Sequence, residues 1–250
     1  MGVTTVAVSS PDDSSHGAPS VDPRRVVIEL AELAGGLAHE LRNPLSTMMI
    51  NLKLLAEDLR DFDAYPRDVR RRALLKVEVL QREAERLQTL FDEFLNLAGP
   101  CSVQRAQVDL HGIVARLVEF CGPLLTANHI HVSVVAERTP VNCSVDEKLL
   151  RQALLNIVIN AQQAMPNGGE LRITCGAEGE WASIAVSDTG VGIPPQYHDR
   201  VFRPFFSTKS GGTGLGLSIT QRIIHEHGGT LAFHSEVGSG TTFTIRLPLH

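Results

Sequence analysis

The sequence has 250 residues, of which 43% are hydrophobic and 20% are charged, and its formal net charge is −5. This composition is that of a globular chain and excludes extensive disorder, collagen and a pure coiled coil. The acidic balance and the low aromatic content of 5% also argue against nucleic-acid binding, which needs a concentrated basic surface and often aromatic stacking.

Residues 1–22 are rich in Ser, Pro, Asp and Gly, so we expect a flexible N-terminal tail without the features of a secretory signal. We predict no membrane span, because no stretch approaches the roughly 20 apolar residues that a bilayer requires. The cysteines are widely spaced and form no CxxC pair, which is typical of a reducing compartment. The expected location is therefore the cytoplasm.

Residues 23–99 repeat apolar side chains at steps of three and four, which predicts two long helices paired as an antiparallel hairpin. Pro66 stands near the start of the second helix, and Gly99 with Pro100 ends it. The stripe of the first helix consists of Leu30, Leu33, Leu37, Leu41, Leu45, Met48, Leu52, Leu55 and Leu59. The stripe of the second helix consists of Ala73, Val77, Leu80, Ala84, Leu87, Phe91, Phe94 and Ala98.

Both stripes are wider than one partner helix covers, because further leucines flank them: Leu54, Leu74, Leu75, Leu90 and Leu95. We therefore expect residues 23–99 to form a homodimer in which two hairpins close a four-helix bundle. The other interpretation is that the second domain of the chain covers the extra apolar surface.

The segment GGLAHELRNPLS places His39 between two leucines of the first stripe, hence on the opposite face of the helix. Asn43 shares that face four residues later, and Pro44 should bend the helix just beyond His39. An exposed imidazole with a free lone pair is a nucleophile at neutral pH, and Glu40 is placed to accept its proton. Taken alone, such a histidine is more often an ordinary surface residue.

After Pro100 the pattern alternates between strands and helices. Helices are expected at 108–125, from a Ser144–Glu147 capping box to about Met165, and at 214–229. Strands are expected at 129–137, 140–145, 170–178, 181–188, 230–236 and 241–249. This order predicts an α/β sandwich, in which a mixed sheet has helices packed on one face.

Asn156 and Asn160 are four residues apart in the second of these helices, so their amides share one face. Amide oxygens suit Mg²⁺, which prefers oxygen ligands and brings its own waters and substrate phosphates. Two amides do not hold the ion alone, so a nucleotide would have to complete its coordination. A pair of solvated asparagines is the alternative interpretation.

Asp188 ends an apolar strand, and Gly190 and Gly192 allow a tight turn where a planar ligand could approach the backbone. A carboxylate at this place is an acceptor for an exocyclic amine such as that of adenine. An ordinary strand-ending turn would show the same residues.

Four glycines between 211 and 216 lead into the helix expected from 214, with Thr213 as its expected N-cap. The amides at such a helix start bind anions, and Lys209 just upstream could reach a terminal phosphate. Three phenylalanines at 202–206 would anchor one end of a hinged loop. The segment is not a Walker A loop, because it lacks the Gly-Lys-Ser/Thr order.

Taken together and in this order, these motifs resemble those of bacterial two-component sensor histidine kinases over residues 25–250. HELRNPL at 39–45 resembles the H box, the asparagine pair the N box, and DTGVG at 188–192 the G1 box. FRPFFSTK, GGTGLGL and GSGTTF resemble the F box, the G2 box and the closing glycine motif. NAQQAMPNGG and PFFSTK resemble the nitrogen-regulator-type kinases in particular. Arg203 departs from the family, which often has an acidic residue there.

The resemblance implies a role for each matching residue. His39 would be the phosphoacceptor, Glu40 its general base, and Asn43 would orient a water for dephosphorylating the partner. Asn160 with Asn156 would hold Mg²⁺, Asp188 would read the adenine amine, and Gly190 and Gly192 would line the purine. The residues that would hold the triphosphate of ATP, beneath a lid at about 195–213, are Lys209, Gly212, Thr213, Gly214, Leu215 and Gly216.

The implied domains are a tail (1–22), a dimerisation and phosphotransfer hairpin (23–99), a linker (100–106) and a Bergerat-type ATP-binding domain (107–250). The implied activity is that of an ATP- and Mg²⁺-dependent protein-histidine kinase, and of a phosphatase toward the same partner. Its partners would be a second copy, the receiver domain of a response regulator and a separate sensory protein. We expect either a stand-alone kinase or an excised catalytic core.

Two rival functions remain open at this point. Another enzyme of the same ATP-binding fold, such as a serine kinase or a conformational ATPase, would form acid-stable phosphoserine or hydrolyse ATP without labelling itself. A catalytically silent dimeric adaptor would bind a receiver domain through its helices. Such an adaptor has no need of Lys209, Asn160 and Asp188 together.

Overall fold

The computed structural model describes residues 37, 41–55, 57, 67–98, 102–136, 139–209 and 212–249, of which 67–70 and 96 are described for the backbone only. The chain divides into two compact units. The helical unit holds the described residues up to Ala98 together with Ser207–Thr213. The sheet unit holds Gly99–Phe206 and Gly214–His250.

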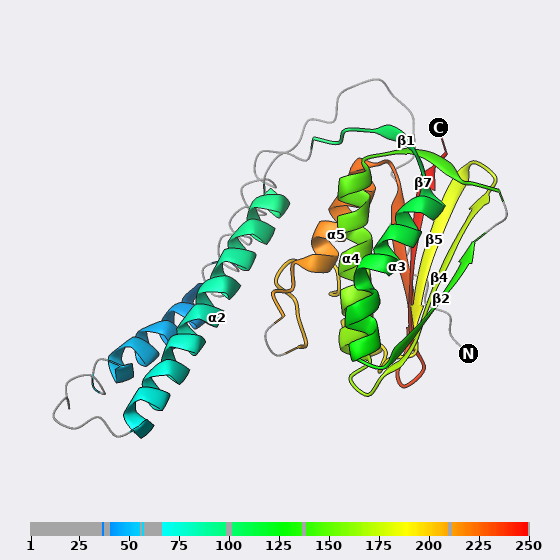
Figure 1. Ribbon diagram of the computed structural model, residues 1–250. Helices are drawn as coiled ribbons and strands as arrows, with labels where there is room; N and C mark the ends of the chain where they lie inside the picture. The colour runs from blue at the N-terminus through cyan, green and yellow to red at the C-terminus, as the bar shows by residue number, and fades with distance from the viewer. Residues whose placement is uncertain are drawn as a thin grey trace. The chain divides into compact units, whose positions relative to one another are not determined.

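The helical unit contains two helices that lie side by side (Figure 1). Residues 41–55 are helical, and α2 spans Arg67–Ala98. The Lys76 ammonium donates to the carbonyl oxygen of Leu54 at 3.0 Å, which ties the two helices together. α2 ends directly before Gly99 and Pro100, as their helix-breaking character predicts. The predicted helical hairpin is confirmed, although residues 23–36 of its first helix lie outside the described residues.

Large apolar side chains are exposed along both helices of this unit. In the first helix, those at least 40% exposed are Leu45, Met49, Ile50, Leu52 and Leu54. In α2, those at least 50% exposed are Leu74, Leu75, Phe91 and Leu95. Leu90, which the sequence places on the same flank, is instead fully buried. The exposed set is the surface that a second hairpin would cover.

The main part of the sheet unit is a five-stranded sheet with three helices on one face (Figure 1). The strand order is β2 (Ile130–Ala136), β4 (Gly169–Glu178), β5 (Trp181–Asp188), β7 (Gly240–Pro248) and β6 (Thr230–Glu236). The helices are α3 (Leu110–Ala127), α4 (Glu147–Ala164) and α5 (Gly216–Glu226). β2 and β4 are parallel and the other neighbours antiparallel, so the predicted mixed sheet is confirmed.

Alternating burial along the strands explains why the helices cover one face only. In β5 every second residue, from Ala182 to Asp188, is buried, and the residues between them are more exposed. The helices contribute a matching apolar stripe to the core, which in α4 consists of Leu150, Ala153, Leu154, Ile157, Val158 and Ala161. Of the described helices, α3 alone is long and apolar enough to cross a bilayer by length and composition, with a mean hydropathy of 1.3, and its apolar stripe is buried in this core.

A short two-stranded sheet, of which the sequence predicted only the strand at 140–145, changes how α4 begins. β1 (Ala106–Asp109) pairs with β3 (Asn142–Val145), so Ser144 is held in a strand opposite Gln107. The predicted cap at Ser144 is therefore wrong. Asp146 caps α4 instead, and its Oδ1 accepts from the Leu149 N–H at 3.1 Å.

Asp146 also joins the start of α4 to two other segments. Its Oδ2 accepts from the Gln104 N–H at 2.9 Å, and its own N–H donates to Nε2 of the buried His227 at 2.9 Å. Since Nδ1 of that ring lies 2.7 Å from the carbonyl of Ile223, the neutral ring donates from Nδ1 and accepts at Nε2. Burial works to raise the pKa of Asp146, but the backbone donors, Gln104 and Leu149 among them, prevail and hold the pKa below its ordinary value.

Candidate nucleotide site

Asp188 is a buried carboxylate at the end of β5, on the face of the sheet that the helices cover. It is 8% exposed, and its Oδ1 accepts from the Gly190 N–H at 2.9 Å and from the Thr241 N–H at 3.2 Å. Two backbone donors fix the position of the carboxylate. The strand alternation puts Asp188 on this face, and the pair of donors turns it into a fixed acceptor at the strand end.

The glycines after Asp188 allow the turn to pack closely against the rest of the sheet unit. A Cβ on Gly190 would lie 2.6 Å from the carbonyl oxygen of Ala164, the last residue of α4. Gly192 has a φ of 72°, and a Cβ there would collide with the carbonyl of Glu236. Glycine is therefore required at both positions by packing inside the protein, a reason that the motif alone does not reveal.

Asn156 and Asn160 both lie in α4, four residues apart, and both are half-buried. The amide nitrogen of Asn156 donates to the carbonyl of Gly216, the first residue of α5, at 3.1 Å. At its other end α4 contacts the turn after Asp188, because the Val191 N–H donates to Ala164 at 3.1 Å. Positions 156 and 164 are about 12 Å apart along the axis, at 1.5 Å per residue. One helix thus connects the Asp188 turn to the start of α5.

α5 begins without a capping side chain. Its N-cap residue is Leu215, whose side chain makes no capping hydrogen bond. The prediction that Thr213 caps this helix is wrong, because Gly214 takes a φ of 69° and the helix begins only at Gly216. Uncapped amides at a helix start carry a partial positive charge and favour an anionic ligand. This end of the site suits phosphate.

Aromatic contacts hold the segment that precedes the glycine-rich loop. Phe202 packs edge-on against Phe233 of β6, with ring centroids 5.7 Å apart. Phe206 lies 5.5 Å from the ring of Tyr197, and the guanidinium of Arg200 lies 4.4 Å from its centroid. The Phe202 contact anchors the chain to β6, as the sequence predicts for this phenylalanine, and the Phe206 contacts hold the segment 197–206 together.

Three predicted triphosphate ligands, Lys209, Gly212 and Thr213, lie in the segment Ser207–Thr213 that groups with the helical unit. Within this segment the Lys209 N–H donates to the Ser207 hydroxyl at 3.1 Å, and the Gly212 N–H donates to the Lys209 carbonyl at 3.3 Å. Both bonds join residues that are two or three positions apart.

The predicted phosphotransfer residues belong to the first helix of the hairpin. His39 and Glu40 lie outside the described residues, and so does Gly211 of the glycine-rich loop. Asn43 is described: it is helical and exposed, and its carbonyl accepts from the Thr47 hydroxyl at 3.2 Å. Its side chain is therefore accessible on the helix surface.

The donor chemistry of the site fits Mg²⁺ better than a transition metal. Among the described residues, no three His, Cys, Asp or Glu side chains converge on one point. The site instead offers amide oxygens, which are hard ligands that Mg²⁺ uses together with nucleotide phosphates. Burial raises the pKa of the Cys121 and Cys143 thiols, which makes them poor nucleophiles and poor metal ligands.

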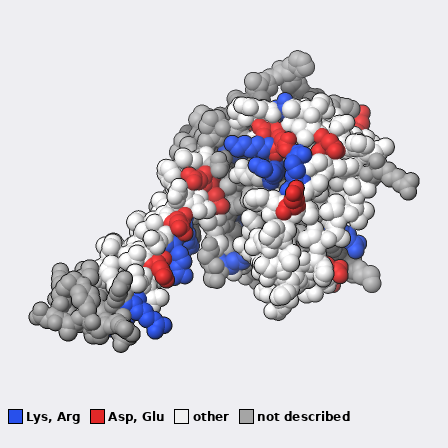
Figure 2. All heavy atoms as spheres, in the orientation of Figure 1, with Lys and Arg blue, Asp and Glu red and all other residues white. Residues whose placement is uncertain are grey.

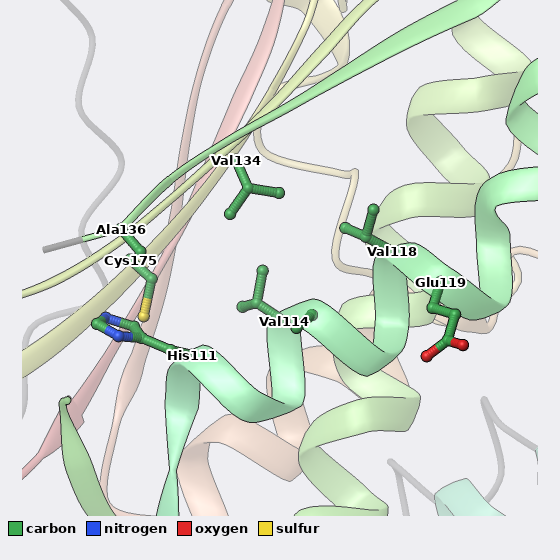
Figure 3. A pocket seen from close by; sticks show the side chains of 8 residues that line it. His111, Val114, Val118, Glu119, Val134, Ala136 and Cys175 are labelled. Carbon is green, nitrogen blue, oxygen red and sulfur yellow. The ribbon is translucent and has the colours of Figure 1, made fainter. Parts of the chain in front are cut away.

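A groove of about 510 Å³ between α3 and β2 holds none of the predicted site residues. Val134 of the strand points toward Val114 and Val118 of the helix, and Cys175 lies beside the His111 ring (Figure 3).

The visible surface of the sheet unit carries charges of both signs, gathered toward one end of the helices (Figure 2). Arg116 of α3 and Glu147 of α4 form an ion pair on the sheet unit.

The residues that hold the acceptor in place, Thr241 and Ser235, belong to none of the predicted motif positions of the site. Thr241 stands opposite Asp188 in the β5–β7 register, and its hydroxyl lies 2.9 Å from that of Ser235. The Ser235 hydroxyl accepts from the Ile193 N–H at 2.7 Å, which ties the turn to β6. The signal that could have found Thr241 is the alternation of residues along β7, because it places Thr241 on the covered face with Phe243 and Ile245.

Comparison with known proteins agrees with this arrangement. Residues 145–250 match the family described as histidine kinase-, DNA gyrase B-, and HSP90-like ATPase, and residues 29–99 match the His Kinase A (phospho-acceptor) domain. The sensor histidine kinase ZraS of Escherichia coli strain K12 is 34% identical over 224 residues, which is 90% of this chain and 46% of ZraS. Sporulation kinase C of Bacillus subtilis is 34% identical over 224 residues, 88% of this chain and 49% of the kinase. The chain thus spans about half the length of these curated relatives.

Solved structures give the same picture. Histidine kinase AdeS of Acinetobacter baumannii has a TM-score of 0.60 at 25% identity, over 85% of this chain and 98% of AdeS. Full-length ShkA in complex with AMPPNP has a TM-score of 0.64 at 26% identity, over 87% of this chain and 45% of ShkA. Histidine kinase ThkA in complex with the response regulator TrrA shares the fold, with a TM-score of 0.73 at 24% identity, over 91% of this chain and 64% of ThkA. A phospho-acceptor hairpin followed by an ATPase sheet unit is the catalytic core of a sensor histidine kinase, and the chain belongs to that family.

Proposed function

We propose that the chain is an ATP-dependent protein-histidine kinase that phosphorylates His39 and passes the phosphoryl group to an aspartate of a separate response regulator. The observation that supports this most is the combination, joined by α4, of the fixed Asp188 carboxylate with the uncapped start of α5. One end offers an acceptor for an adenine amine, and the other offers amide donors for phosphate. The complex of ShkA with AMPPNP supports the same ligand class.

In the proposed complex the nucleotide lies along α4. Asp188 accepts from the adenine amine, and Gly190 and Gly192 line the purine. The groups that hold the triphosphate are Lys209 and the backbone of Gly212, Thr213, Gly214, Leu215 and Gly216. Asn160, with Asn156, holds Mg²⁺ through amide oxygens, and the ion when bound neutralises charge on the phosphates.

The reaction is an in-line transfer. A lone pair on a ring nitrogen of His39 forms a bond to the γ-phosphorus while the bond from that phosphorus to the bridging oxygen breaks and ADP leaves. Glu40 takes the proton that the imidazole loses. Positioning supplies most of the acceleration, since nucleophile and phosphorus meet within one assembly. The roles of His39 and Glu40 rest on the sequence motif.

The phosphoryl group on nitrogen then passes to the receiver domain. ThkA is seen in complex with the response regulator TrrA, which supports a partner of this class. Asn43, exposed four residues from His39, orients water for hydrolysis of the receiver phosphate and gives the kinase a phosphatase activity. The apolar side chains exposed on both helices support a homodimer through residues 23–99. The expected location remains the cytoplasm.

Autophosphorylation tests the proposal. The purified chain with radiolabelled ATP and Mg²⁺ should acquire phosphate that is labile in acid and stable in alkali. His39→Gln should abolish labelling, whereas the control His131→Gln, an exposed histidine on β2, should leave it unchanged. Label that survives His39→Gln would remove His39 from its role.

The same experiment separates the rival functions. Acid-stable phosphoserine, or steady release of ADP without labelled protein, would favour another enzyme of the same ATP-binding fold. Failure of the wild-type chain to bind a fluorescent adenine nucleotide at millimolar Mg²⁺ would favour a silent adaptor.

A further inference from the structure

Thr220 is a fully buried polar residue in α5 whose hydroxyl lies where α5 meets α4. The hydroxyl donates to the carbonyl of Gly216, one turn earlier, at 2.8 Å. It lies 3.4 Å from the amide nitrogen of Asn156 and 3.5 Å from the carbonyl of Ala153, both in α4. A valine of the same shape would fill this space, so the hydroxyl itself calls for an explanation.

The contacts determine which way the Asn156 amide faces. The Gly216 carbonyl is an acceptor only, so the group of Asn156 that lies 3.1 Å from it is the NH₂ and not the oxygen. The same NH₂ faces the Thr220 hydroxyl, which accepts from it while donating to Gly216. The Asn156 oxygen is thereby turned away from α5. This is the orientation in which the oxygen is available to a cation.

Thr220 also fixes the carbonyl on which Asn156 depends. A threonine that bonds back to the carbonyl four residues earlier tilts and holds that peptide group. Here the peptide belongs to the first residue of α5, at the uncapped end of the helix. The Thr220 hydroxyl thus orients both the Gly216 peptide, at the phosphate end of the site, and the side-chain amide of Asn156, the proposed cation ligand.

We propose that Thr220 is a positioning residue for the magnesium–nucleotide complex. Its hydroxyl holds the Gly216 carbonyl and the NH₂ of Asn156 so that the Asn156 oxygen is presented to Mg²⁺. The inference rests on the proposed ATP site and adds a residue that touches neither the nucleotide nor the ion. Its effect belongs to the Mg²⁺-dependent part of nucleotide affinity, because the adenine contacts at Asp188 involve none of these groups.

Two matched pairs of variants isolate the hydroxyl. Thr220→Val removes the hydroxyl and keeps the branched shape. Thr220→Ser keeps the hydroxyl and removes a methyl group, and Thr220→Ala removes both. Thr and Val therefore differ in the hydroxyl, and Ser and Ala differ in the same group at a smaller volume. If packing alone mattered, Val would be harmless and Ser harmful; the proposal requires the reverse for the Mg²⁺-dependent affinity.

The measurement is the dissociation constant for ADP with Mg²⁺ and with EDTA, by isothermal titration calorimetry on the full chain, alongside the melting temperature. Thr220→Val should reduce the enhancement by Mg²⁺ about five- to tenfold, the effect of losing one hydrogen bond, while affinity in EDTA stays within about twofold. Thr220→Ser should keep the wild-type enhancement even where its melting temperature falls. If Thr220→Val does not fold, the Ser and Ala variants give the same comparison.

The outcomes separate this inference from the proposed function. A wild-type chain that binds no ADP contradicts the ATP site itself. A wild-type chain that binds ADP with Mg²⁺ enhancement, beside a Thr220→Val variant with the same enhancement, overturns the positioning role alone. Equal loss in the Ser and Ala variants would also overturn it, because the hydroxyl would then make no difference.

Discussion

Individual residues of the nucleotide site are held by backbone groups that are distant in the sequence. A Cβ on Gly240 would collide with the carbonyl of Asp188, and the next residue, Thr241, donates its N–H to the Asp188 carboxylate. The closing glycine motif therefore lets β7 approach the acceptor. Position 240 matches the family motif and also has a physical need for glycine, because only glycine permits this contact at a φ of 115°.

Gly214 and Gly216 form a matched pair for a prediction at this scale. Gly214 has a φ of 69°, and a Cβ there would lie 2.5 Å from the carbonyl carbon of Phe205, whereas a Cβ on Gly216 would meet Asn156 only at 3.7 Å. Gly214→Ala should lower the free energy of unfolding by about 1–3 kcal/mol, the usual cost of strained backbone, and weaken ADP binding. Gly216→Ala should remain near wild type in stability.

Thermal melting and titration with ADP check this pair. A Gly214→Ala variant as stable as Gly216→Ala would show that the close approach to Phe205 does not exist in solution.

Among elements, β5 was predictable with its boundaries, and α4 was predictable except for its cap. Alternation from Trp181 to Asp188 is a local pattern, and it gave both the strand and the covered face. The cap of α4 was not local: Ser144 and Asp146 are both good caps, and the pairing of β3 with β1 decides between them. The start of α5 was also predicted wrongly. The positive φ of Gly214 prevents the helix from beginning directly after Thr213.

Asp146 supplies a prediction at the scale of the element it caps. Asp146→Ala should lower the free energy of unfolding at pH 7 by about 0.5–2 kcal/mol, the usual worth of an N-cap. The pKa of Asp146 is lowered in the folded protein, so its charge contributes stability above the unfolded pKa of about 3.9, and that contribution is lost as pH falls below this value. The difference in free energy of unfolding between wild type and Asp146→Ala should therefore become smaller in acid.

Urea unfolding at pH 7 and at about pH 3 measures this difference in free energy of unfolding. Asp146→Asn is the control: it keeps a capping oxygen without the charge, so at neutral pH it should lose less than the alanine variant. An alanine variant whose deficit is the same at both pH values would contradict the role of the carboxylate charge.

For the whole molecule, long-range contacts were the part that the sequence could not supply. The motif order identified the two domain types, but the bond from Thr241 to Asp188 depends on β7 lying beside β5, which no local pattern contains. The contact between Asn156 and Thr220 likewise depends on how α4 packs on α5. The nitrogen-regulator subtype stays a prediction.

The homodimer is the prediction at this scale. Sedimentation should give a mass of twice 27.2 kDa. Leu74→Glu combined with Leu95→Glu should shift the chain to monomer, because both side chains are about half-exposed on α2 and burying the exposed half of each contributes about 1 kcal/mol. Phe120→Glu is the control, since that side chain is 71% exposed on the sheet unit. A double variant that stays dimeric, or a control that dissociates equally, would contradict an interface on the hairpin.

The position of β7 has a consequence for synthesis. This strand is translated after every other strand of the five-stranded sheet, yet it lies between β5 and β6 and supplies an amide to Asp188. A nascent chain on the ribosome therefore lacks both the closing strand and the donor that fixes the acceptor. Nucleotide capture should begin only once residues 240–248 have emerged from the exit tunnel.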